Sequence, residues 1–283
     1  MILKKFTNDK KQRLSKSILN NLQIGYNKVQ LLIRDKNVKV LGKRAKEDCV
    51  VEAGAEIEVY LQEEKLKIAY ENDDVIVVVK PRGIEIESDV DESLQMKVSK
   101  QIGRDVFAVH RLDRNTAGLV VFAKNKSAKN SLDRAFKNRT IEKYYLALVF
   151  GKPKNESLKL SAYLKKDNEK NIVKISSEKA EFYEPIKTNC RLLWSNGEIS
   201  LLEVELVTGK THQIRAHLAY VGLPIIGDEK YGDNEKNKLY KKRYQSLFAY
   251  KIIFHFDLKD CLSELDGVKI EIDKNEIDFC KNL

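Results

Sequence analysis

The sequence predicts an α+β protein made of a small basic module followed by a larger, strand-rich mixed domain. Charge is the first observation. Residues 1–46 carry thirteen lysines and arginines against two acidic residues, a net charge of +11, so the rest of this +10 chain carries −1. Apolar side chains recur at helical spacing early in this basic segment. After residue 70, short apolar runs bounded by turn residues indicate buried strands.

Residues 1–62 are predicted to form a helix–helix–hairpin domain. Two short helices are expected, the first interrupted by Gly25 and Asn27 and the second ending near residues 35–37. Their apolar faces comprise Leu14, Ile18, Leu19 and Leu22, then Val29, Leu32 and Ile33. Residues 38–40 and the alternating 57–61 suit the strands of the hairpin. The charge favours a polyanionic partner, although a solvated basic face is the alternative.

Residues 63–69 are predicted to form a charged linker, and residues 70–283 the second domain. Its strand-like runs are residues 75–79, 119–123, 143–149, 201–206 and 246–254, with an antiparallel excursion over 151–198. Helical patterns are expected over 93–104, from Ser127 to Asn138, and from Thr211 to Val221, with Ser127 and Thr211 as candidate N-caps.

Composition narrows the class of protein. Of the 283 residues, 42% are hydrophobic, but no apolar run approaches the ~20 residues of a membrane span, and no signal peptide is expected. The four cysteines are scattered without metal-ligand spacing, which suits reduced thiols in the cytoplasm. We expect a cytoplasmic protein without a membrane or metal requirement.

The stretch from His110 to Ala123 carries the first candidate for chemistry. Asp113 lies in a polar loop that feeds the predicted strand at residues 119–123. A carboxylate on such a rigid support suits a reactive group. The alternative is an ordinary loop aspartate that caps a turn.

A second polar block runs from Leu206 through Leu218 to Gly232. His212 and Arg215 lie about one helical turn apart within it. His212 and His217 are rejected as metal ligands, because their five-residue spacing does not place them on one helix face and no thiol or carboxylate completes a set.

These motifs resemble those of the RluA-type RNA pseudouridine synthases. The string His-Arg-Leu-Asp at 110–113, followed two residues later by Thr-Ala-Gly-Leu, resembles their signature. The related small-subunit type usually has Gly where His110 stands. The Lys-Tyr-Tyr segment at 143–145 and the block at 206–232 extend the likeness over most of the chain after about residue 70. Residues 1–62 resemble the RNA-binding domain of the ribosomal-protein S-four type, through segments 32–35, 38–43 and 54–57.

The resemblance implies a bent, mainly antiparallel sheet and a role for several residues. Asp113 would be the catalytic carboxylate, Arg215 its ion-pair partner, and Tyr145, rather than Tyr144, the aromatic that lies against the base. Lys80 would contact the RNA backbone or lie in solvent. RNA contacts are expected in two groups. Arg111 and Arg114, beside Asp113, would contact phosphates or act as a wedge. The basic module would contact phosphates through Lys28, Arg34, Lys36, Lys43 and Arg44.

The expected function is that of an isomerase, working without a cofactor, that converts specific uridines of structured RNA to pseudouridine. Large-subunit ribosomal RNA is the expected partner, and a monomer the expected state. Asp113 would attack C1′ or take a proton from the sugar, and the sequence does not choose. The alternatives are the same isomerase acting on transfer RNA, a non-catalytic ribosome-associated RNA-binding protein, and, more distantly, a sugar-cleaving hydrolase.

Overall fold

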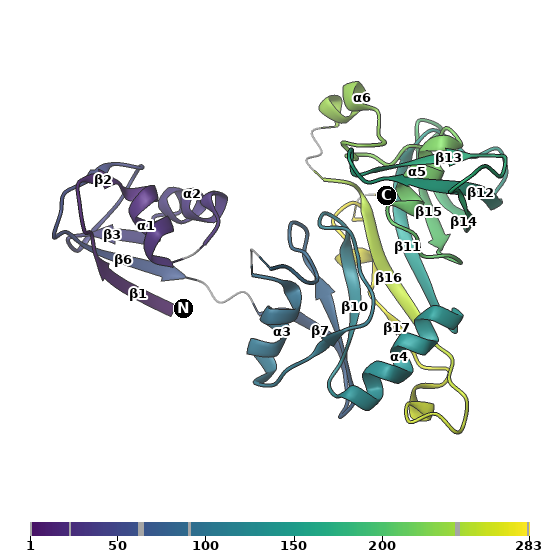
Figure 1. Ribbon diagram of the computed structural model, residues 1–283. Helices are drawn as coiled ribbons and strands as arrows, with labels where there is room; N and C mark the ends of the chain where they lie inside the picture. The colour runs from purple at the N-terminus through teal and green to yellow at the C-terminus, as the bar shows by residue number, and fades with distance from the viewer. Residues whose placement is uncertain (1, 23, 62–64, 90–91, 241–243, 282) are drawn as a thin grey trace. The chain divides into compact units, whose positions relative to one another are not determined.

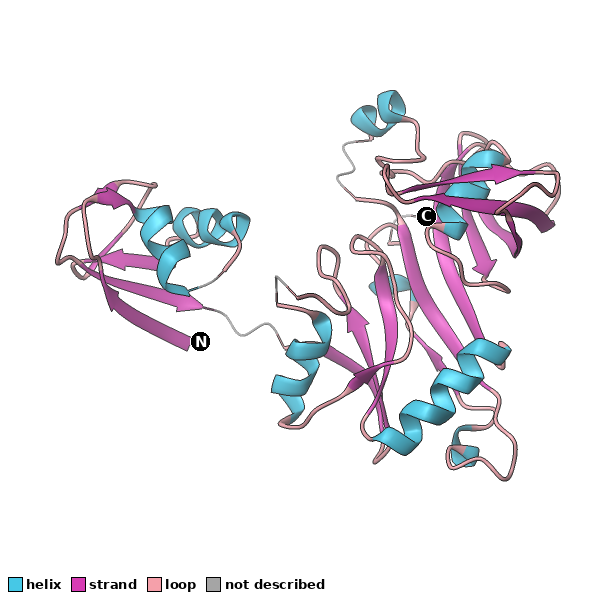
Figure 2. Cartoon of the chain, viewed as in Figure 1, coloured by secondary structure: helices cyan, strands magenta, loops and turns pink. Residues whose placement is uncertain are grey.

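The chain folds into two compact units, residues 1–65 and 66–283. The computed structural model describes residues 2–22, 24–61, 65–89, 92–240, 244–281 and 283. Strands predominate over helices in both units (Figure 2). No helix within these described residues is long and apolar enough to span a membrane.

The first unit packs two helices against a four-stranded antiparallel sheet (Figure 1). The sheet order is β1-β6-β3-β4, where the strands are β1 (Ile2–Thr7), β3 (Val38–Val40), β4 (Lys43–Arg44) and β6 (Glu56–Leu61). A further pair joins β2 (Gln12–Arg13) to β5 (Val50–Val51). The helices are α1 (Leu14–Leu22) and α2 (Tyr26–Arg34). Asn27 lies inside α2, so it does not interrupt the helical pattern as the sequence suggested, and Gly25 is the N-cap.

A simple hairpin was expected here, but the structure has a larger sheet, because β1 adds a strand that the sequence did not indicate. Lys4 and Lys5 give β1 the appearance of a charged arm. As an edge strand it pairs only with β6, and edge strands commonly carry charged side chains. Lys5 Nζ donates to Glu58 Oε1 on β6 at 2.6 Å.

The second unit is built on an eleven-stranded sheet with the order β13-β12-β14-β15-β11-β16-β10-β8-β7, and with β17 on β16 and β9 on β10. Its strands are β7 (Lys67–Glu71), β8 (Val75–Lys80), β9 (Phe107–Ala108), β10 (Ala117–Ala123), β11 (Ile141–Phe150), β12 (Ser157–Asp167), β13 (Ile172–Ser176), β14 (Glu184–Ser195), β15 (Ile199–Glu205), β16 (Leu247–Phe254) and β17 (Lys269–Glu271). The pairing of β10 with β16 is parallel and the others are antiparallel.

Helices cover both faces of this sheet, so its central strands are buried on both sides. On one face lie α4 (Lys126–Asn138) and the C-terminal segment, including the short 3₁₀ turns Ser263–Leu265 and Lys274–Glu276. The other face carries α3 (Leu94–Ile102) and α5 (Gln213–Tyr220), while α6 (Asn234–Leu239) follows α5 in the chain. Because successive side chains of a strand point to opposite faces of the sheet, Leu146 points toward the α4 side and Tyr145 toward the α5 side.

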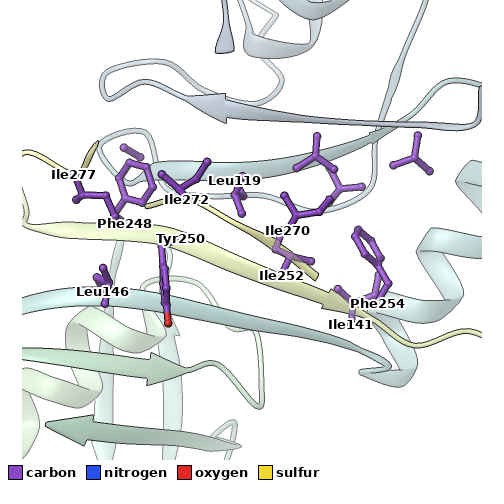
Figure 3. Packing of buried hydrophobic residues seen from close by; sticks show 14 of the residues in the cluster. Leu119, Ile141, Leu146, Phe248, Tyr250, Ile252, Phe254, Ile270, Ile272 and Ile277 are labelled. Atoms are coloured by element: carbon purple, nitrogen blue, oxygen red, sulfur yellow. The ribbon is translucent and has the colours of Figure 1, made fainter. Parts of the chain in front are cut away.

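The core on the α4 side joins β10, β11 and β16 to the C-terminal segment. Figure 3 shows Phe248, Tyr250, Ile252 and Phe254 of β16 packed among side chains from neighbouring strands and from the chain end. The remaining labelled side chains are Leu119, Ile141, Leu146, Ile270, Ile272 and Ile277. Phe248 is 8% exposed and belongs to this core.

Three local expectations are corrected. Residues 67–69 of the predicted linker begin β7, whereas 63 and 64 lie outside the described residues. Asn125, not Ser127, caps α4, because its side chain accepts a bond from the Ala128 N–H. The N-cap of α5 is His212 rather than Thr211, and it has a left-handed φ of 53°.

Candidate active site

The predicted catalytic residues line one cavity of about 290 Å³ in the second unit. Asp113 comes from the loop between β9 and β10, Tyr145 from β11 and Arg215 from α5. More than thirty residues separate each from the next in the sequence, and the sheet and the α5 face bring them together. Among the described residues that line the cavity, Asp113 is the one carboxylate.

The backbone of the Asp113 loop is held in place by the buried side chain of Lys80. The Lys80 ammonium donates to the carbonyls of Arg114 at 2.8 Å and Pro81 at 3.0 Å, and the Gly83 N–H also donates to Arg114, at 2.9 Å. Both sequence-based alternatives for Lys80 are wrong, since its side chain is fully buried. Burial lowers the pKa of Lys80 to about 7, although the nearby Asp113 charge opposes that shift.

Arg215 bridges two carboxylates. Its Nη1 donates to Asp113 Oδ2 at 2.8 Å, while Nε and Nη2 donate to the two oxygens of Asp228 at 2.6 and 2.9 Å. Burial disfavours the charged guanidinium, but the two carboxylates outweigh it and raise the pKa of Arg215 above its ordinary value. The guanidinium is therefore a permanent cation whose orientation is set by a two-point contact.

Asp228 is a site residue that the sequence alone did not single out. Burial favours its neutral form, yet bonds to Arg215 and to the backbone hold the pKa of Asp228 below its usual value. The N–H groups of Lys230 and Tyr231 donate to Oδ1 at 2.9 and 3.1 Å. The chain then turns back so closely that a Cβ at Gly232 would collide with the Asp228 carbonyl. The Gly-Asp…Tyr-Gly pattern at 227–232 was the available signal.

Tyr145 and Tyr144 leave β11 on opposite sides. Tyr145 is 5% exposed and lines the cavity. Burial, and then the Asp113 charge, raise the pKa of Tyr145, so the phenol stays protonated. Tyr144 instead donates to Glu142 at 2.6 Å, with Lys251 Nζ 4.1 Å from its ring centroid.

The histidines at the start and in the body of α5 have separate environments. His212 Nδ1 lies 2.9 Å from the Tyr231 hydroxyl and Nε2 lies 4.0 Å from Asp113 Oδ2, and burial lowers the pKa of His212. His217 contacts Thr188 Oγ1 at 3.0 Å, and burial lowers its pKa to about 4. Across the described part of the chain, no group of three His, Cys, Asp or Glu side chains is arranged to hold a metal ion.

Comparison with known proteins decides what this arrangement is. Residues 74–220 match the model of the family described as RNA pseudouridylate synthase. This match includes Asp113, Tyr145 and Arg215. The chain belongs to the RNA pseudouridine synthase family.

Relatives within this family extend the likeness beyond the catalytic segment. An RNA pseudouridine synthase of Mycoplasma genitalium is 36% identical over 69% of this chain and 65% of its own length. One from Mycoplasma pneumoniae is 32% identical over 96% of this chain and 93% of its own length. The ribosomal large subunit pseudouridine synthase C of Vibrio cholerae is 30% identical over 78% and 77%, respectively.

Two solved structures named as RNA pseudouridylate synthase domain proteins have the same fold as this chain. The structure named human RNA pseudouridylate synthase domain containing 1 superposes with a TM-score of 0.63 and 26% identity, covering 78% of this chain and 89% of that one. Human RNA pseudouridylate synthase domain containing 4 gives a TM-score of 0.57 at 22% identity, over 66% and 84%. The mixed fold with a mainly antiparallel sheet is therefore that of pseudouridine synthases, a class of enzymes that isomerise uridine to pseudouridine.

The predicted RNA contacts divide between this pseudouridine synthase site and the first unit. Arg111 is exposed and lines the cavity. Arg114 is exposed but does not line it, and its Nε donates to the Gly83 carbonyl at 3.2 Å. Of the five residues predicted in the basic module, Arg34, Lys36, Lys43 and Arg44 are exposed on the first unit, whereas Lys28 is half-buried.

Proposed function

We propose that this chain converts specific uridines of large-subunit ribosomal RNA to pseudouridine, with Asp113 as the catalytic carboxylate. The observation that carries the proposal is the 2.8 Å ion pair between Arg215 Nη1 and Asp113 Oδ2, inside a cavity that Tyr145 also lines. The RNA target rests on the relatives, since the enzyme named from Vibrio cholerae is a ribosomal large subunit pseudouridine synthase. Work on ribosomal RNA would place the protein in the cytoplasm.

The reaction breaks the bond between N1 of uracil and C1′, turns the base, and joins C5 to C1′; the C5 proton then leaves and N1 gains one. Asp113 has a charge suited to attack on C1′ or to removal of a sugar proton. The hydrogen bond from Arg215 Nη1 to Asp113 Oδ2 limits the rotation of this carboxylate. A single carboxylate in the described cavity lining fits an isomerase better than a glycosidase, which ordinarily uses two.

Tyr145 is proposed to support the uracil ring. Its aromatic ring on a rigid strand offers a flat surface next to Asp113, and its phenol remains protonated at neutral pH because burial raises its pKa. A support for the base is therefore a better role for it than a base catalyst. The uridine has to leave any helical stack before it enters the cavity.

The first unit is proposed to be an RNA-binding domain of the ribosomal-protein S-four type. Its two helices on a small sheet, the exposed cations at 34, 36, 43 and 44 and the half-buried Lys28 support this role. Phosphate contacts of this kind position a protein on RNA without reading its sequence.

Pseudouridine mapping tests the proposal. Total RNA is compared between cells with the gene, without it, and complemented with the wild-type or the Asp113→Asn protein. We expect discrete large-subunit sites to vanish with the gene and to return only with the wild type. Sites in transfer RNA would replace the proposed substrate, and restored sites with Asp113→Asn would refute its catalytic role. Release of free uracil in vitro would indicate a hydrolase instead.

A further inference from the structure

Three basic side chains that line the active-site cavity have no acidic partner in the described part of the chain. Arg111, Arg139 and Lys143 all line it and form no ion pair within the described residues. Lys210, a fourth cation of the cavity, differs because it is paired with Glu184. The cavity thus brings together positive charges that the described part of the protein does not neutralise.

Lys143 is the most constrained of the three. It is half-buried on β11, with Nζ 5.6 Å from the centroid of the Phe136 ring. A Cβ at Gly209 would lie 3.4 Å from this Nζ, so the ammonium rests against the loop that precedes α5. Burial, and then the charge of Arg139, lower the pKa of Lys143. Two like charges close together without a counterion are unfavourable, and an anionic ligand would relieve that cost.

The neighbouring side chains of His110 and Phe136 carry no negative charge that could neutralise Lys143. His110 stacks on Phe136 with ring centroids 4.5 Å apart, and its Nε2 accepts the Val121 N–H at 2.9 Å. Burial, and then the charge of Lys143, lower the pKa of His110 to about 3, so the imidazole is neutral. It neither pairs with an anion nor provides one. Phe136 thus contacts both the neutral imidazole and the Lys143 ammonium.

We propose that Lys143 and Arg139 form a subsite for a phosphate of the target nucleotide itself. Lys143 and Tyr145 are two residues apart on β11, roughly 7 Å along the strand, and both line the cavity. That separation is comparable with the distance between the base and the phosphate of one nucleotide. A uracil on Tyr145 would bring its own phosphate to Lys143, whereas the exposed Arg111 would serve the flanking backbone. The subsite rests on the proposed action on RNA uridines.

The test uses a short RNA that the wild-type protein isomerises, so a failure of the proposed function would be seen first, as absence of turnover. Single-turnover rates are measured with a neutral methylphosphonate at either phosphate flanking the target uridine. We expect one of the two substitutions to lower the wild-type kcat/KM by roughly ten- to hundredfold, the effect expected when a hydrogen bond to a charged group is removed. No decrease at either position would overturn the proposal.

The variant Lys143→Gln supplies the second half of the test. It should show a similar decrease with the unmodified RNA and no further decrease with the critical methylphosphonate, because both changes remove the same interaction. Lys143→Arg, which keeps the charge, should retain most of the activity and reports on misfolding. Lys137→Gln, an exposed lysine of α4 outside the cavity, is the charge-matched control and should match the wild type. Effects of Lys143→Gln and the methylphosphonate that multiply would contradict a shared interaction.

Discussion

At the Asp113 carboxylate, the Arg215 guanidinium forms hydrogen bonds with two carboxylates, those of Asp113 and Asp228. Arg215 offers a single nitrogen to Asp113 and a two-point contact to Asp228, which is 1% exposed and held by two backbone N–H groups. The geometry makes Asp228 the anchor of Arg215 and leaves Asp113 with a single contact to it, which suits the catalytic role proposed for Asp113. Removing one partner of such a buried set leaves an uncompensated charge.

We predict that Asp228→Asn lowers kcat roughly ten- to hundredfold while KM for RNA stays within about threefold, because the variant loosens Arg215 without touching the RNA. Single-turnover and steady-state kinetics on the same RNA give the two constants. Asp233→Asn, at the N-cap of α6, is the control that leaves Arg215 in place. An unchanged kcat, or an effect confined to KM, would contradict the anchoring role.

Lys80 predicts a pH dependence of stability. Its pKa is about 7 in the folded chain and 10.5 when unperturbed, so between these values the unfolded state binds more protons. The free energy of unfolding should therefore rise with pH in this window, by up to roughly 1.4 kcal/mol per pH unit, and be insensitive to Lys80 below it. Urea unfolding of the wild type and Lys80→Met at four pH values from about 6 to about 9, spanning the lower part of this window, checks this. A difference between the two proteins that stays constant with pH would contradict it.

The sequence was informative where chemistry follows a contiguous motif and uninformative where it depends on distant packing. Asp113, Tyr145 and Arg215 each lie in a recognisable block, and the structure brings them to one cavity. Strand alternation also separates Tyr145 from Tyr144. The burial of Lys80 could not be predicted from its strand-end position, because one of the carbonyls that its ammonium bonds belongs to a loop more than thirty residues away.

At the scale of elements, the site depends on where β10 meets β16 in parallel. This junction pairs Ala117 and Gly118 with Phe248 and Ala249, directly after the Asp113 loop. Gly118 has a φ of +122°, and a Cβ there would collide with the Ala249 backbone. Glycine is thus required both for its conformation and for the close approach of the two strands.

Gly118→Ala should therefore destabilise the second unit by about 3 kcal/mol or more, since both strain and displacement of β16 are involved. Gly197→Ala is a matched control: its φ is +95°, but nothing lies within 4 Å of the added Cβ. It should cost only about 1 kcal/mol of backbone strain. Chemical denaturation of both variants measures the difference. Equal destabilisation would show that the close strand approach at Gly118 is unimportant.

The elements that were predicted well are those with a clear apolar period, such as α1, α3 and the central strands β8, β10 and β11. Their burial on one or both faces leaves a pattern in the sequence. The edge strands β1 and β7 were missed because an edge position tolerates charged, half-exposed residues. Helix starts were displaced by one or two residues, since a cap depends on one local hydrogen bond.

For the whole molecule, the charge asymmetry is the basis of the separate tasks proposed for the two units. The basic cluster of Lys28, Arg34, Lys36, Lys43 and Arg44 should supply affinity for RNA through phosphates, while the 66–283 unit carries the chemistry. Neutralising each phosphate releases counterions, which makes binding dependent on salt. Affinity and catalysis should then respond to separate substitutions.

We predict that changing these five cations to Gln weakens RNA binding and lowers the slope of log K against log salt by about 0.7–0.9 for each phosphate that the protein no longer neutralises. The single-turnover rate at saturating protein should stay within about twofold of the wild type, because Asp113 and its partners are unchanged. Binding isotherms at several salt concentrations give the slope. The control neutralises five exposed lysines of the second unit, Lys154, Lys159, Lys166, Lys170 and Lys174. If the control lowers the slope as much as the N-terminal set does, the RNA-binding role belongs to the net charge of the chain and not to its first unit.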